Sequence, residues 1–360
     1  MLEINENVFN RAASILKERF SAYKTEIASS LPSITSEIKE VIMDTRRICF
    51  DVVSIDGSYC VLWNHPVIPV SLSIVRIAAV TRKYDPNLIK IETIFNDFND
   101  YIVVIDEKDK KTIIIDKTGD VEEIEMASNT VNHEITKIME NKEWKTALKT
   151  AETNHGIMIF RDSVIRSPSE QRVLEPIKIM RSCEENGNVF VGIVKDSGMR
   201  DINGFVTNEN LLGIISKQND HRGFTGYYQV HPGDNRIKAG TCYARLHPRA
   251  LKWIRVDYQV TTLMDVDEIL RTIACYSQVN TMPGIPFPPL CAHEIAIKIA
   301  QLKQSSSFYN EYIMKLLKSL HFSDQEIIEG LTKGINGEGA LGNLHDYLDG
   351  FTSVRPVDNS

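Results

Sequence analysis

The chain has 360 residues, of which 42% are apolar and 25% charged, so it can form one large domain or two ordinary ones, and its composition excludes wholesale disorder. The net charge of −7 argues against a simple nucleic-acid coat protein. The N-terminus lacks the apolar segment of a signal peptide, and the longest apolar run, residues 68–80, is too short to span a bilayer. We therefore expect a cytoplasmic protein without a membrane segment.

Common signatures of metal and catalytic sites are missing. The six cysteines are scattered and form no C-x-x-C pair, which predicts buried, reduced thiols and no zinc site. The sequence contains no phosphate-binding P-loop and no G-x-S-x-G. The stretches "HEITK" at His133 and "HEIAIK" at His293 lack the second histidine of a zinc protease.

The first predicted element is an amphipathic helix over residues 6–29. Its apolar side chains alternate at spacings of four and three: Phe9, Ala13, Leu16, Phe20, Tyr23 and Ile27. We favour packing on the core over a helical dimer contact, because fewer than four heptads are present. A second short helix is expected over residues 33–43, after Pro32.

The middle of the chain predicts strands and helices in alternation. Strands over 48–55 and 67–80 flank an expected turn at Asp56-Gly57-Ser58. Further predictions are a hairpin ("YIVVID" and "TIIID"), a helix over 128–154, buried strands over 156–165 and 189–198, and a strand pair near 240–260. The pattern indicates one α/β domain with a mixed sheet and helices around it.

Charge is distributed unevenly along these elements. Residues 91–130 hold 11 acidic and 4 basic side chains, whereas "RLHPRALKWIR" from Arg245 to Arg255 contains four Lys or Arg, one His and no acid. The acidic block could be a partner surface, but a solvated hairpin is the favoured interpretation. The basic stretch could form a locally positive surface.

The C-terminal part begins with a helix that Asp265 caps, with Glu268 completing a capping box. A Pro-rich loop then leads into a helix at "GIPFPPLCAHEIAIKIAQL". The Gly-rich end of the chain is expected to be a loose tail. The expected organisation is a helical segment over 1–44, a main domain over 45–305, and a helix with tail over 306–360.

Two carboxylates occupy unusual positions. Asp56 follows a buried strand, and Asp162 lies inside the strand-like "IMIFRDSVI". Charged side chains are rarely buried unless they are paired or bind a metal. Two such acids and a third from a helix can hold two divalent cations that activate water against a phosphodiester. The alternative is an ordinary turn in which Asp56 bonds its own backbone.

The order "VVSIDGS", "IMIFRDS", "VFVGIVKDS", "CYARLHP…WIRVDY" and "GIPFPPLCAHEIA" resembles the NurA family over roughly residues 45–305. These are DNA-end-processing nucleases with an RNase H-like core, so the resemblance implies an α/β fold with an RNase H-like mixed sheet, surrounding helices and additional strands.

The resemblance also implies site residues. The family's two strand aspartates match Asp56 and Asp162, although the glycine expected after Asp162 is missing. The family's helical glutamate matches Glu143 better than Glu152, and Glu143 could equally be a solvated charge. The family's late histidine matches His293.

The match to the family is less informative at two further positions. The family's lysine matches Lys195, which could contact a phosphate or extend to solvent. The family's tyrosine, eight residues before the histidine, is replaced by Ile285.

The resemblance implies a metal-dependent 5′-to-3′ exonuclease, with possible single-strand endonuclease activity, that processes DNA ends in double-strand-break repair. Asp56, Asp162 and Glu143 would hold two Mn²⁺ or Mg²⁺ ions, and His293 would assist. Lys195, Arg245, Arg249 and Arg255 would hold the DNA backbone, and Trp253 could stack a base or belong to the core. The implied partners are a second copy of the chain and a HerA-type hexameric translocase.

Two alternatives remain open from the sequence. One is a weakly active or inactive NurA-like scaffold for a translocase, which Ile285 and the missing glycine favour. The other is an RNase H-like nuclease that acts on RNA.

Overall fold

The structure is a computed structural model. It describes residues 6–41, 50–65, 67–85, 87–88, 90–165, 174–194, 199–200, 202, 207–218, 225–233, 238–250, 252–277, 284–300, 314–319, 323 and 325.

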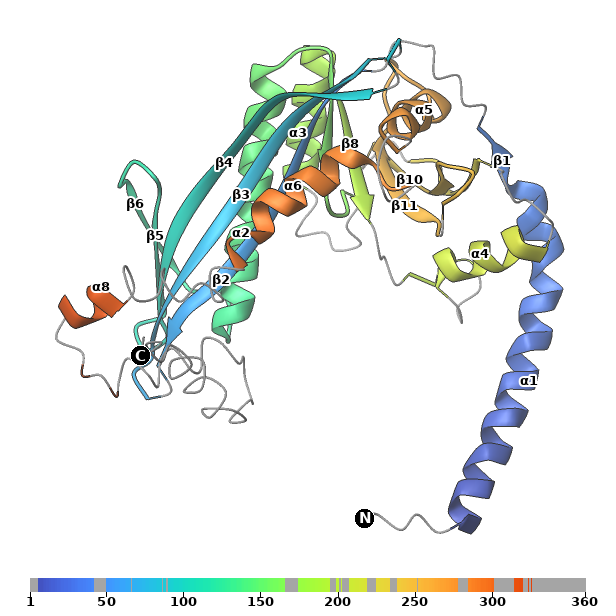
Figure 1. Cartoon of the computed structure of the whole chain (residues 1–360), viewed down its shortest axis with the longest axis horizontal. Coiled ribbons are helices and arrows are strands. Elements are labelled where there is room, and N and C mark those ends of the chain that lie inside the picture. Colours follow the sequence, from blue (N-terminus) through green and yellow to red (C-terminus); the bar gives the residue numbers. More distant parts are fainter. Residues whose placement is uncertain are drawn as a thin grey trace, which may run out of the picture. The chain divides into compact units, whose positions relative to one another are not determined.

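The described strands form one mixed sheet of eleven strands, in the order β1-β9-β10-β11-β8-β7-β2-β3-β4-β5-β6 (Figure 1). The strands are β1 (Lys39–Glu40), β2 (Asp51–Asn64), β3 (Val70–Asp85), β4 (Lys90–Asp106), β5 (Lys111–Ile115), β6 (Val121–Glu125), β7 (Ile157–Arg161), β8 (Val189–Val194), β9 (Gly226–His231), β10 (Ala239–Arg245) and β11 (Ile254–Gln259). The helices are α1 (Glu6–Glu37), α2 (Val131–Thr153), α3 (Leu174–Asn186), α4 (Asn208–Gln218), α5 (Val266–Ser277), α6 (Phe287–Ile297) and α8 (Met314–Ser319). No described helix combines the length and apolar character needed to cross a bilayer.

The chain divides into two compact units. Unit 1 contains residues 1–53, 82–94 and 150–290, and unit 2 contains residues 54–81, 95–149 and 291–360. Strands β2, β3 and β4 therefore each contribute residues to both units.

Unit 1 is built on strands that read as almost continuous apolar runs. All five residues of β7 are buried, and β7 pairs in parallel with β8, which is the pattern of strands covered on both faces. β11 pairs antiparallel with both β8 and β10, which confirms the predicted strand pair near residues 240–260. Helix α5 packs Leu270 and Ile273 into this core.

The capping box at the start of α5 is confirmed. The Glu268 backbone N–H donates to Asp265 Oδ1 at 2.8 Å, and the Asp265 N–H donates to Glu268 Oε2 at 3.2 Å. These two bonds satisfy donors that a helix start leaves without intrahelical partners.

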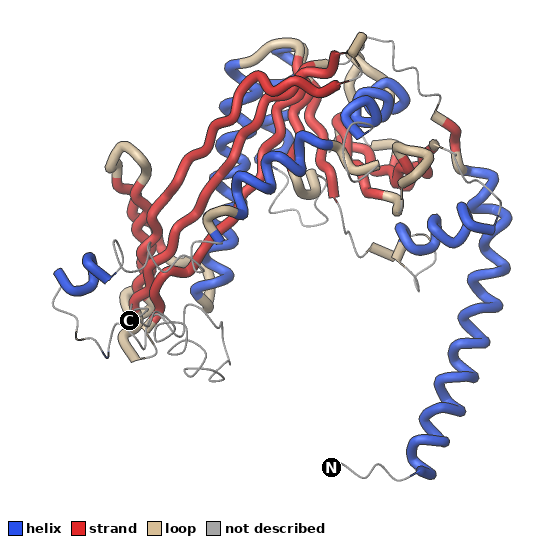
Figure 2. Tube along the Cα trace, in the orientation of Figure 1, coloured by secondary structure: helices blue, strands red, loops and turns tan. Residues whose placement is uncertain are grey.

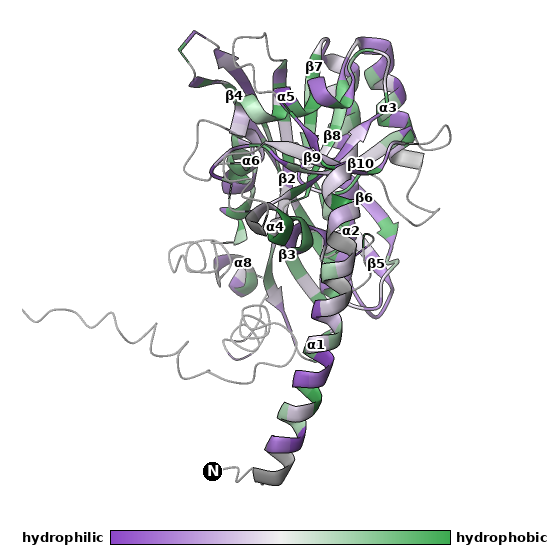
Figure 3. Ribbon diagram, turned by 90° about the vertical axis from the view of Figure 1, so that its right-hand side faces the viewer, coloured by the Kyte–Doolittle hydropathy of each residue, from purple (hydrophilic) through white to green (hydrophobic). Residues whose placement is uncertain are grey.

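Unit 2 contains long strands with a helix on each side. β4 and β5 form the predicted hairpin, with Ile102 opposite Ile115 and Asp106 opposite Lys111. The predicted helix over 128–154 is α2. Two views related by a quarter turn show α2 and α6 on opposite faces of β2 and β3 (Figures 1 and 3), and the same arrangement can be followed in the trace of Figure 2.

The predicted turn at Asp56-Gly57-Ser58 is wrong, because β2 runs without interruption from Asp51 to Asn64. A Cβ added to Gly57 would lie 2.6 Å from Glu143 Oε1, 2.7 Å from Met139 Cγ and 3.0 Å from Ile77 Cδ1. Gly57 is therefore a strand residue over which α2 packs closely, and this is one of the roles of glycine inside strands.

The N-terminal predictions are also corrected. α1 continues through Pro32 to Glu37, so no separate second helix begins there. Pro32 lies in the last two turns of this helix. The apolar face of the helix does not pack on the core, since Leu16 is 69% and Phe20 74% exposed. Near its C-terminal end, Ile34 packs in a hydrophobic cluster with residues of α4.

The described cysteines fit the prediction of buried thiols. Five of the six, Cys60, Cys183, Cys242, Cys275 and Cys291, are buried and form no disulfide, and Cys49 lies outside the described residues.

Candidate metal centre

Asp56 lies inside β2 and is buried, with 7% of its surface exposed. The N–H of Gly57 donates to its Oδ1 at 2.9 Å. Its second oxygen, Oδ2, lies 2.9 Å from Nδ1 of His293. Both oxygens of this buried carboxylate thus contact polar groups, as burial of a charge requires.

His293 is delivered by α6. The helix begins at Phe287, and prolines follow in its first turn, where a missing N–H breaks no intrahelical bond. Cys291, Ala292 and Ala296 are buried. The His293 side chain remains 45% exposed, so its ring contacts Asp56 while part of it reaches solvent.

Asp162 is the first residue after β7, which ends at Arg161, so the prediction that Asp162 lies inside the strand is wrong. One potential ligand atom from each of Asp56, Asp162 and His293 lies within 4.8 Å of the others, so these three residues form a group that could hold a metal ion. Two carboxylates and an imidazole are ligands that can bind a divalent cation.

Glu143 was predicted as the third ligand and is not in this group of described residues. It is 4% exposed, and its Oε1 approaches the Gly57 backbone from α2. Successive Cβ atoms of a strand point to opposite faces, and α2 covers the face opposite to α6. Glu143 therefore meets β2 on the face away from His293, and its role as a ligand stays a prediction.

The residues predicted to contact DNA differ in their exposure and surroundings. Lys195 lies outside the described residues. Arg249 is exposed in the loop between β10 and β11, and the half-buried Arg245 donates through Nη2 to the Pro248 carbonyl at 3.0 Å. Burial and the charges of Arg249 and Arg245 lower the pKa of His247, so this loop is locally basic.

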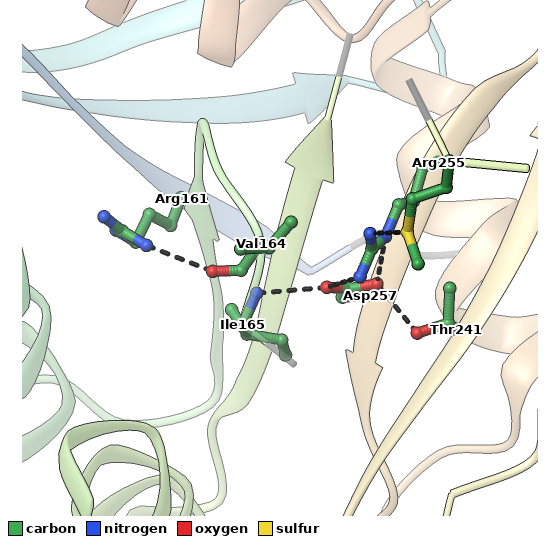
Figure 4. Close-up of polar contacts among 7 residues, drawn as sticks. Arg161, Val164, Ile165, Thr241, Arg255 and Asp257 are labelled. Atoms are coloured by element: carbon green, nitrogen blue, oxygen red, sulfur yellow. Dashed lines mark hydrogen bonds and ion pairs between the residues drawn. The ribbon is translucent and has the colours of Figure 1, made fainter. Parts of the chain in front are cut away.

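Arg255 does not fit the predicted phosphate contact. It is 5% exposed and forms a two-point ion pair with Asp257, at 2.8 Å from Nε and 2.9 Å from Nη2 (Figure 4). Trp253 belongs to the core, because it is 1% exposed and its Nε1 donates to Ser216 Oγ at 3.0 Å. The remaining candidates for backbone contacts are Arg245, Arg249 and Lys195.

The sequence reasoning missed Asp257, although "WIRVDY" contained the signal. Two opposite charges two positions apart in an otherwise apolar strand lie on the same face and can pair when buried.

Ile285, which takes the place of the family's tyrosine, is half-buried just before α6.

No family model matches the sequence, and no curated protein matches it significantly. Two solved structures nevertheless match almost the whole chain. The crystal structure of the NurA nuclease from Sulfolobus solfataricus matches with a TM-score of 0.52 and 17% identity, over 88% of this chain and 98% of that one. A second NurA crystal structure matches with a TM-score of 0.53 and 11% identity, over 91% of this chain and all of the other.

The chain has the NurA fold. The predicted α/β class, a mixed sheet with surrounding helices, is thereby confirmed, and so is the resemblance to NurA structures on which it was based. Sequence identities this low show the fold alone, so activity has to be argued from the residues of the site itself.

Proposed function

We propose that this NurA-like protein is a metal-dependent DNA nuclease that processes DNA ends. The observation that carries the proposal is the group of Asp56, Asp162 and His293 on a NurA fold. A buried aspartate beside a second carboxylate is unfavourable unless positive charge compensates it, and a divalent cation would supply that charge.

Asp56 and Asp162 would hold the cation, which when bound activates water and stabilises charge at the scissile phosphate. His293 keeps the Asp56 carboxylate oriented through Nδ1. Its Nε2 would serve a proton-transfer role toward the substrate, because His exchanges protons near neutral pH.

We further propose Mn²⁺ or Mg²⁺ as the ion, and two ions as the working number. Two ions need more ligands than one group of three residues offers. Glu143 is the candidate for an additional ligand, on the family resemblance stated above.

The proposed substrate is the end of a DNA duplex, trimmed 5′ to 3′, and the proposed partners are a second copy and a HerA-type translocase. A net charge of −7 is compatible with this role if the translocase delivers the DNA and contacts are confined to the basic loop. Arg245, Arg249 and Lys195 are the proposed contacts.

The test is Mn²⁺-dependent degradation of end-labelled linear DNA, with Asp56→Asn beside wild type. We expect Asp56→Asn to lose more than about a hundredfold in rate, since even outer-shell partners of a metal site cost 10- to 100-fold. Asp51→Asn, on the same strand but outside the group, is the matched control and should cleave as wild type does.

Other outcomes separate the alternatives. Equal activity in wild type and Asp56→Asn would remove the proposed site. No wild-type activity on DNA with the translocase present would support the scaffold alternative. The replacement of the family's tyrosine by Ile285 favours that alternative. Cleavage of matched RNA in place of DNA would support an RNase H-like ribonuclease.

A further inference from the structure

A buried ion pair lies on β11 of unit 1, apart from the proposed metal ligands. Arg255 and Asp257 are two residues apart on one face of the strand, and their side chains are 6% and 0% exposed. Nε of Arg255 donates a hydrogen bond to Oδ1 of Asp257, and Nη2 donates to Oδ2. Nη1 of Arg255 contacts the sulfur of Met199, so the guanidinium is enclosed as well.

The Asp257 carboxylate accepts two further hydrogen bonds. Oδ1 accepts from the Thr241 hydroxyl of β10 at 2.9 Å. Oδ2 accepts from the backbone N–H of Ile165 at 3.1 Å, three residues after Asp162 (Figure 4). Four donors thus converge on one carboxylate, which is a full set for its lone pairs.

Gly192 explains how a β11 side chain reaches the segment after β7. Gly192 is the register partner of Arg161 on β7 and of Asp257 on β11, so it lies between them. A Cβ on Gly192 would collide with the Ser163 carbonyl oxygen and lie 3.2 Å from the Ile165 nitrogen. Its missing side chain leaves the path through which Asp257 holds Ile165.

The segment from Asp162 to Ile165 is fixed at both ends. β7 holds its start, and Nη1 of Arg161 donates to the Val164 carbonyl at 3.1 Å. Asp257 holds its end. A metal ligand needs its backbone placed to within about 0.5 Å, and a segment anchored only at one side would not supply that.

We infer that Arg255 and Asp257 are positioning residues that fix the Asp162 carboxylate for metal binding. The inference rests on the proposed function, since it assigns Asp162 as a ligand. The pair itself does not touch the ion or the substrate, and it acts through the Ile165 backbone.

The test compares two double variants that both remove the buried charges. Arg255→Met with Asp257→Leu deletes the anchor, whereas Arg255→Met with Asp257→Asn keeps one oxygen that can accept from Ile165. Replacing both members avoids leaving one charge buried alone, and apolar replacement of a buried pair is often neutral for stability. The matched control is Arg76→Met with Asp100→Leu, which removes a two-point pair at 2.7 Å between β3 and β4.

The readouts are Mn²⁺ affinity by calorimetry, hydrogen exchange of the Ile165 amide, and the urea unfolding midpoint. We expect the Leu variant to bind Mn²⁺ at least about tenfold more weakly and to exchange Ile165 faster. The Asn variant should recover most of the affinity, and the control should match wild type.

Wild-type Mn²⁺ affinity in a folded Leu variant would overturn the inference. Equal losses in the Leu and Asn variants would also overturn it, because they would indicate a general effect of the lost charges. If wild type bound no Mn²⁺, or if its Mn²⁺ affinity equalled that of Asp56→Asn, the proposed function would be contradicted instead. These results are distinguishable because the first two require Asp56-dependent binding in wild type.

Discussion

Two consecutive residues of β2 serve different faces of the sheet. The Asp56 carboxylate contacts His293 of α6, and Gly57 lets α2 approach the strand on the other side. The geometry at this point therefore depends on the absence of one methyl group.

Gly57→Ala should destabilise the protein. Its new methyl group would overlap Glu143 and Met139, and overpacking of this kind costs about 1–3 kcal/mol. Urea unfolding measures the effect. Gly213→Ala is the matched control, because nothing lies within 4 Å of that position in α4, and alanine there should stabilise by up to about 1 kcal/mol. A Gly57→Ala midpoint at or above that of wild type would contradict the close approach of α2.

The contributions of His293 and Glu143 to metal binding can be compared by parallel substitutions. His293→Ala removes a member of the three-residue group, whereas Glu143→Gln changes a residue on the other face of β2. We expect the larger loss of Mn²⁺ affinity, at least about tenfold, in His293→Ala, measured by calorimetry. The reverse order would place Glu143 in the first coordination sphere and restore the ligand set that the family resemblance implied.

At the scale of elements, α1 carries an apolar face that the described residues leave uncovered. Leu16 and Phe20 are 69% and 74% exposed, and Ile15 and Tyr23 are 51% and 45% exposed. Figure 3 shows apolar and polar residues alternating along this helix. The spacing of four and three is that of a helical pair, so the dimer contact, which was the less favoured interpretation from sequence, stays a prediction that can be tested on this helix.

Leu16→Glu should weaken self-association, because a charge would be buried in the helix contact at an energetic cost. Sedimentation velocity over a range of protein concentrations measures it. Ser14→Glu adds the same charge to the other side of α1 and should leave association unchanged. If both variants associate as wild type does, or if wild type does not associate, α1 is not a dimer contact.

Local signals in the sequence predicted several elements well. The hairpin of β4 and β5 and the capping box of α5 depend on residues a few positions apart, and both are confirmed. The turn at Gly57 was mispredicted because the role of that glycine depends on Glu143, far along the chain. The same limit applied to Arg255, whose partners on β10 and after β7 become neighbours only in the folded sheet.

For the molecule as a whole, burial of thiol and phenol groups predicts a loss of stability at alkaline pH. Burial, with a smaller contribution from Glu184, raises the pKa of Cys183 from 9.0 to about 12. Burial and Cys242 raise the pKa of Tyr258 from 10.0 to about 12, against the Gln229 hydrogen bond. In each case the folded-state pKa is the higher one, so the stabilisation is complete below the unfolded pKa and is lost as pH rises toward the folded value.

The urea midpoint should therefore fall as the pH rises from about 9 toward about 12. Cys183→Ala removes one contributing group, so its midpoint should fall less steeply over the same interval. An equal slope in the variant would show that Cys183 ionises as readily in the folded protein as in the unfolded one.

Because Asp56 and Gly57 face opposite sides of the sheet, β2 should also be intolerant of a shift in strand register. Deleting one residue before Asp56 shifts the register by one and exchanges the two faces. The glycine would then face His293, Ser58 would take the place of Gly57 against Glu143, and the aspartate would turn to the face covered by α2. One deletion would thus remove the aspartate from the metal site and place a side chain where α2 leaves no room, so insertions and deletions should not be tolerated within this strand.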